Sequence, residues 1–160
     1  RAEAVADFMT RNRERFRPFA PARTDNYYAV GHWRSAVRQA GRAWREETAF
    51  RYVIEDGTSV VGKIDIDPVQ RGPFQSGTLG YLLCAGAEGR GVMAGALRQV
   101  LAVAFAGHGL HRMQAAIMPD NARSLALIRT LGFREIGLAE RYLLLDGVWR
   151  DHLLFEKVAR

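Results

Sequence analysis

Residues 78–105 read TLGYLLCAGAEGRGVMAGALRQVLAVAF, a stretch that joins a strand pattern to a helix pattern through a glycine-containing turn. It starts with an apolar strand pattern over 78–84 and ends with apolar residues at helical spacing over 92–105. Glycines in the turn between them let the backbone approach a ligand closely. The first turn of the helix offers unpaired N–H groups and the positive end of a dipole. The loop Glu88-Gly89-Arg90-Gly91-Val92-Met93 is therefore predicted to bind an anion such as a diphosphate.

Two familiar phosphate loops are excluded by the residues that follow these glycines. No Gly-Lys-Ser/Thr is present, so this is not a Walker loop, and a third glycine is missing for a dinucleotide fingerprint. Taken alone, the glycine pair is also compatible with an ordinary tight turn between a strand and a helix.

The rest of the chain alternates between helical and extended patterns. Helices are predicted over 2–16, 30–47, 92–105 and 121–131, and strands over 50–55, 60–66, 78–84, 112–118, 133–145 and 149–157. This order of hairpins and strand-helix-strand crossovers indicates one α/β (α+β) domain, residues 1–160, around a mixed sheet. Trp33, Trp44 and Trp149 fall at core-like positions and are expected to pack there.

The net charge of +6 favours anionic partners, namely a polyphosphate cofactor, a nucleoprotein particle or nucleic acid. No dense basic run or nucleic-acid motif is present, and no apolar run is long enough for a membrane span. The sole cysteine, Cys84, cannot form an internal disulfide, which fits a reducing cytoplasm. It is expected to be a buried, inert thiol rather than a nucleophile.

Downstream of the glycine loop, Asn121-Ala122-Arg123-Ser124 opens a predicted helix that closes with Gly132-Phe133. Together, the loop and this helix resemble the GNAT acetyltransferase superfamily. The resemblance implies a mostly antiparallel, twisted sheet flanked by about four helices. It also implies that a first strand precedes residue 1.

The same resemblance implies that acetyl-CoA is the cosubstrate and that no metal takes part. The residues that would bind acetyl-CoA, some through backbone groups, are Tyr81, Leu82, Leu83, Gly89, Arg90, Gly91, Val92, Met93, Ala94, Asn121 and Ser124. Two positions depart from the family pattern. Glu88 stands where Gln or Arg is usual, and Met93 stands where Gly or Ala is usual.

Met93 and several further segments resemble the ribosomal-protein-alanine N-acetyltransferase branch. They include Leu79-Gly80-Tyr81, Met118-Pro119-Asp120-Asn121 and Gly147-Val148-Trp149-Arg150-Asp151-His152. The likeness implies acetylation of the N-terminal α-amine of a ribosomal protein, of the small-subunit protein five type. The implied partners are that N-terminus and the ribosome or its assembly intermediates, without a membrane.

The chemistry needs a neutral amine that attacks the thioester directly. At neutral pH about 10% of an α-amine is neutral but well under about 0.1% of a lysine, a difference of roughly 3 kcal/mol. A weak base or a chain of waters therefore suffices, and a water-mediated path is the preferred hypothesis. The carboxylate alternatives are Asp65, Asp67 and Glu140.

The usual acid and base of a related branch are absent, because the matching positions hold Ile128 and Ala116. Ser124 is predicted to protonate the thiolate or donate a hydrogen bond to it, although it is also an ordinary first-turn helix serine. Asn121 is likewise either a pantetheine ligand or a helix cap. The four histidines lack metal-ligand spacing and are interpreted as structural or surface residues.

Two other functions remain open on the sequence. One is acetylation of a small amine, such as an antibiotic, a polyamine or an amino sugar. The other is a non-catalytic module that binds acyl-CoA or a nucleoprotein. The proline-punctuated loop from Phe16 to Pro21 either lines the acceptor site or covers the core.

Overall fold

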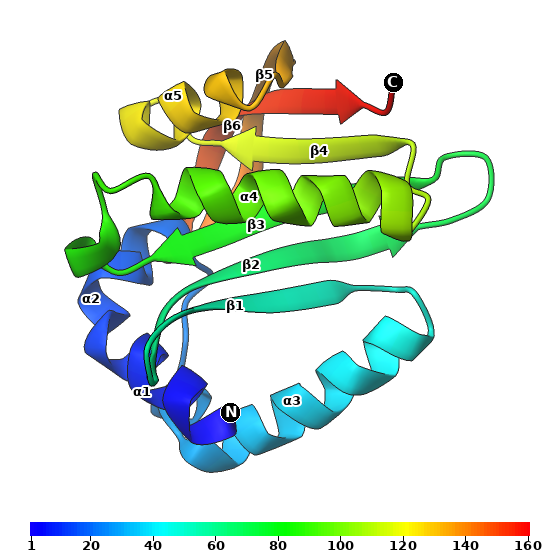
Figure 1. Ribbon diagram of the computed structural model, residues 1–160. Helices are drawn as coiled ribbons and strands as arrows, with labels where there is room; N and C mark the ends of the chain where they lie inside the picture. The colour runs from blue at the N-terminus through cyan, green and yellow to red at the C-terminus, as the bar shows by residue number, and fades with distance from the viewer.

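A six-stranded sheet in the order β1-β2-β3-β4-β6-β5 organises the chain (Figure 1). The computed structural model describes residues 1–160. Its strands are β1 (Phe50–Asp56), β2 (Ser59–Gln70), β3 (Ser76–Leu83), β4 (Arg112–Ile117), β5 (Arg134–Leu145) and β6 (Val148–Val158). Only the β3–β4 pair is parallel. The predicted mixed, mostly antiparallel sheet is therefore confirmed.

Five α-helices accompany the sheet: α1 (Ala2–Arg11), α2 (Arg13–Phe16), α3 (Val30–Arg45), α4 (Val92–Ala102) and α5 (Ala122–Thr130). The prediction of a single helix over 2–16 is wrong, because the helix is interrupted at Asn12 and continues as the separate helix α2. The Asn12 side-chain amide donates to the Phe8 carbonyl at 2.8 Å. Such a local bond offers the backbone an alternative to continued helix.

One face of the sheet carries the main core. Side chains from β1, β2, β3, β4 and β6 meet α4 and α5 there, and Ile64, Leu97, Met113, Ile128 and Phe155 are among the most buried. In Figure 1, α4 lies across this face. A second cluster gathers residues of α1, α2 and α3 around Phe8 and Trp33. Side chains alternate along a strand, so every second residue points away from α4.

One of the three tryptophans does not pack as predicted, because Trp149 is 58% exposed. Trp33 is buried at 8% exposure, and Trp44, although 39% exposed, packs edge-to-face against the buried Phe50 ring at 5.0 Å. Helix α3 runs alongside the β1 edge of the sheet (Figure 1), and Val37 on this helix is 41% exposed. Cys84 is partly buried against the second cluster. None of the helices is both long and apolar enough to cross a bilayer.

The parallel strands β3 and β4 are paired over only part of their length and then separate. Paired residues run from Ser76 with Arg112 to Leu79 with Ala115, and no pairing follows. Beyond that point β3 continues to Leu83 and β4 continues to Ile117. The two strands therefore diverge, and one edge of residues 80–83 has no strand neighbour.

Candidate active site

A cavity of about 880 Å³ lies where β3 and β4 diverge. Its walls come from β2, β3, β4, β6, the turn between β5 and β6, the start of α4, the start of α5 and the segment around residues 15–23. Nearly all the residues predicted to bind acetyl-CoA line it: Tyr81, Leu82, Leu83, Gly89, Gly91, Val92, Met93, Ala94, Asn121 and Ser124.

The glycine loop delivers α4 to the cavity with its first turn open. Gly91 is the N-cap residue, with φ of 73°, and no side chain caps the helix. This left-handed conformation favours glycine. The N–H groups of the first turn therefore remain available to an anionic ligand.

Arg90 was predicted to lie beside the bound diphosphate, but the arginines beside this loop in the cavity are Arg15 and Arg123. Arg90 does not line the cavity, and its guanidinium lies 3.9 Å from the Asp56 carboxylate. Glu88 instead forms ion pairs with both Arg15 and Arg123, and all three line the cavity. Glu88, where the sequence pattern leads one to expect Gln or Arg, thus holds two guanidinium groups near the open helix end. The sequence did not predict the ion pair of Arg15 with Glu88, because the two residues lie 73 positions apart in the chain.

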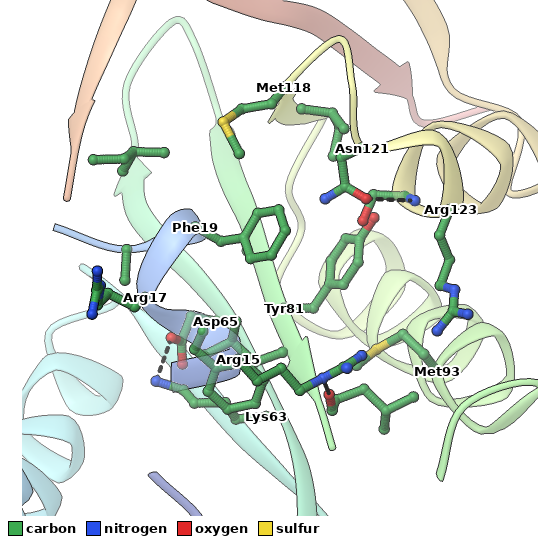
Figure 2. Close-up of a pocket in the computed structure, with 18 of the residues that line it drawn as sticks. Arg15, Arg17, Phe19, Lys63, Asp65, Tyr81, Met93, Met118, Asn121 and Arg123 are labelled. Carbon is green, nitrogen blue, oxygen red and sulfur yellow. Dashed lines mark hydrogen bonds and ion pairs between the residues drawn. The ribbon is translucent and has the colours of Figure 1, made fainter. Parts of the chain in front are cut away.

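The start of α5 contributes a polar corner. The Asn121 side chain accepts a hydrogen bond from the Ser124 N–H at 3.2 Å, so Asn121 does cap the helix. Figure 2 shows Tyr81, from β3, pointing toward Asn121. Burial raises the pKa of Tyr81, and the nearby Ser124 hydroxyl partly opposes that shift.

The Tyr81 hydroxyl is shielded from solvent and makes no hydrogen bond of normal geometry. With its raised pKa it stays protonated at neutral pH and can donate to a ligand atom. Sequence reasoning considered only the backbone of Tyr81 and missed this donor. Ile128, by contrast, is fully buried in the core and does not reach the cavity.

Removing the cap of α5 gives a first testable result. Asn121→Ala should lower the free energy of unfolding by about 1 kcal/mol, because the Ser124 N–H loses its acceptor. Urea unfolding measures this change. Asn121→Asp keeps a capping oxygen and should retain most of the stability. Equal stability of the Ala variant and the unaltered chain would contradict the capping role.

Of the three carboxylates considered as a base, one lies in the cavity. Asp65 lines it, and its Oδ2 lies 2.8 Å from Lys63 Nζ (Figure 2). Its Oδ1 is buried and has no hydrogen-bond partner. Asp67 is paired with Arg51, Glu140 is exposed on β5, and neither lines the cavity.

One of the histidines that the sequence marks as structural or surface residues belongs to the cavity wall. His152, on β6, is only 3% exposed and lines the cavity together with Ala116 of β4. Its Nδ1 lies 2.9 Å from the Arg150 carbonyl oxygen. Only the strand alternation of β6 could have suggested this from sequence.

The segment from Phe16 to Pro21 forms part of the cavity rim. The Asp146 N–H, in the turn between β5 and β6, donates to the Ala20 carbonyl at 2.9 Å. Arg17 Nε also donates to the Asp146 carboxylate at 3.2 Å, and this bond raises the pKa of Arg17. These contacts hold the two loops together at the cavity mouth.

Comparison with known proteins supplies the family. A model described as "Acetyltransferase (GNAT) domain" matches residues 2–134. The chain is 32% identical over 152 residues to the ribosomal protein uS5 alanine N-acetyltransferase of Escherichia coli (strain K12), covering 94% of this chain and 78% of that protein.

Two solved structures extend the comparison. The ribosomal-protein-S5-alanine acetyltransferase from Vibrio fischeri superimposes with a TM-score of 0.95 at 30% identity, over 98% of this chain and 87% of that one. Mycobacterium smegmatis RimJ, in complex with CoA-disulfide, gives 0.93 at 33% identity, over 99% of this chain and 77% of that one.

Proposed function

The chain belongs to the GNAT acetyltransferase family, and on that premise we propose that it acetylates the N-terminal α-amine of a ribosomal protein of the uS5 type. The family makes it an N-acetyltransferase. The finer assignment of the acceptor draws on the likeness to the uS5-alanine enzymes and on the charges in the cavity. Such an acceptor and acetyl-CoA would meet in the cytoplasm.

The cavity fits acetyl-CoA along one wall. The open first turn of α4, with Arg15 and Arg123 beside it, suits the diphosphate. The unpaired edge of residues 80–83 offers backbone groups to the pantetheine amides. Acetyl-CoA supplies the activated acetyl group, and the chain binds and orients it.

The observation that carries the acceptor class is the pairing of the acidic groups in the cavity. Glu88 is occupied by two arginines, and Asp146 is occupied by Arg17. Only Asp65 keeps a buried oxygen without a partner. An acceptor with one ammonium group therefore fits, whereas a polyamine would need several free carboxylates.

An α-amine can be deprotonated without a strong base from the protein. It loses a proton about 3 kcal/mol more easily than a lysine at neutral pH. Backbone N–H groups on the free edge of β3 can stabilise negative charge on the thioester oxygen. Ser124 and Tyr81 supply hydroxyl donors for the leaving thiolate.

Ser124→Ala tests the thiolate donor. We expect kcat to fall by about 10-fold to 100-fold while the KM for acetyl-CoA changes little, because the helix cap uses the Ser124 backbone N–H. Thiol release measures both constants. Thr130→Val is the matched control, since it removes a hydroxyl at the far end of α5 that bonds only to Ala126. An unchanged kcat in Ser124→Ala would remove Ser124 from the mechanism.

The acceptor class is tested by a thiol-release comparison of three substrates. These are a peptide with the alanine N-terminus of uS5, the same peptide with its α-amine blocked, and a mixture of polyamines and amino sugars. We expect release with the first alone. Release with the mixture and not with the free peptide would overturn the proposed acceptor.

A further inference from the structure

Four residues form a row across the face of the sheet that points away from α4. They are Asp65 on β2, Gly80 on β3, Ala116 on β4 and His152 on β6. Asp65 pairs directly with Gly80. All four line the cavity.

The position of His152 follows from the β4–β6 register. Ala116 pairs with Leu154, and His152 lies two residues before Leu154, on the same face. Residues so related are diagonal neighbours within reach of long side chains. His152 thus stands next to Ala116 on the cavity wall. The small alanine side chain leaves room beside it in the cavity.

The middle of the row is an open floor. Gly80 has no side chain, and a Cβ atom built on it would meet nothing within 4 Å. Ala116 adds only a methyl group. Since β3 and β4 have already diverged here, an amine lying on this floor is next to the free strand edge that is proposed to bind acetyl-CoA.

One end of the row attracts a cation. Asp65 Oδ1 is buried and unpartnered, although Oδ2 is held by Lys63. A buried carboxylate oxygen without a donor costs about 1–3 kcal/mol or more. A substrate ammonium would supply the missing donor.

The other end of the row accepts a proton. A carbonyl oxygen only accepts hydrogen bonds, so the contact with the Arg150 carbonyl requires the hydrogen on His152 Nδ1. The Nε2 lone pair is then free. An imidazole nitrogen with a free lone pair can act as a general base.

We propose that this row is the acceptor-amine site, in which Asp65 binds the ammonium form and His152 Nε2 removes its proton. The proposal rests on the N-acetyltransferase function. The freed lone pair forms the C–N bond at the acetyl carbon, and the C–S electron pair leaves on sulfur. Of the three ammonium protons, one passes through His152 to solvent, one ends on the thiol and one stays on the amide.

His152→Asn isolates the proton step. The asparagine amide can keep the bond to the Arg150 carbonyl, but nothing replaces Nε2. We expect kcat with the peptide amine to fall by about 100-fold or more, with unchanged protection from heat by acetyl-CoA. A peptide that begins with an aminooxy group is already neutral and should lose less than about 10-fold. Equal losses with both acceptors, or no loss, would overturn the role.

Asp65→Asn isolates the binding step. The KM for the peptide amine should rise by about 10-fold, with little change in acetyl-CoA affinity. Asp67→Asn is the matched control, because this neighbouring carboxylate is ion-paired outside the cavity. Identical effects of the two variants would overturn the site. The His152 and Asp65 variants are both assayed with an amine that the unaltered chain acetylates. If that amine is not the uS5 N-terminus, the uS5 assignment is overturned, but the two variants still test the acceptor site.

Discussion

Gly91→Val is expected to abolish the protection from heat that acetyl-CoA gives the folded chain. A ligand at 100 times its dissociation constant stabilises a protein by about 2.7 kcal/mol, and the variant should lose this shift. Gly91 holds φ at 73°, a conformation that a β-branched residue does not adopt without strain. A valine would therefore strain and move the turn that presents the first N–H groups of α4.

The control separates strain from binding. Gly109 has φ of 64°, with nothing within 4 Å of a built Cβ atom, and lies beyond the far end of α4, outside the cavity. Gly109→Val should lower the melting temperature of the free chain by a comparable amount and keep the acetyl-CoA shift. A normal shift in Gly91→Val would show that the diphosphate lies elsewhere.

Gly80→Val should stop acetyl transfer while leaving acetyl-CoA binding intact. Gly80 has no positive φ and sits in open space, so β3 tolerates a β-branched residue. The added side chain fills the floor on which the acceptor amine is proposed to lie. We expect transfer to the peptide to fall by about 100-fold or more, since misplacement by 1 Å already costs about that much.

Thr78→Val is the matched control for this variant. Thr78 points to the same face of β3 but lies where β3 still pairs with β4, outside the cavity. Thiol release should be unchanged in this control, and thermal protection by acetyl-CoA should persist in both variants. Full transfer by Gly80→Val would mean that the acceptor does not approach over β3.

The secondary structure could be predicted because its signals are local. Alternation identifies β1 and β2, the Asp56-Gly57 and Asp146-Gly147 turns join the hairpins, and helical spacing identifies α4. The break at Asn12 was missed because it depends on which way one side chain turns.

The residues on the acetyl-CoA side of the cavity could be predicted from the sequence, whereas most of those on the acceptor side could not. The glycine loop and the Asn121 helix are contiguous patterns, whereas the acceptor face is assembled by strand register. Asp65 and Asp67 look equivalent in sequence. Asp65 pairs with Gly80 of β3, in the regular part of the β2–β3 ladder. The register becomes irregular after Ile66, so Asp67 has no such partner on β3. His152 reaches the cavity only because β6 pairs with β4.

The most direct measurement is mass spectrometry of ribosomal proteins that lack N-terminal acetylation, after incubation with acetyl-CoA and the purified chain. We expect one acetyl group on the α-amine of uS5, with lysine side chains unmodified. Lysine acetylation, or no acetylation of any protein N-terminus by a chain that acetyl-CoA protects from heat, would contradict it.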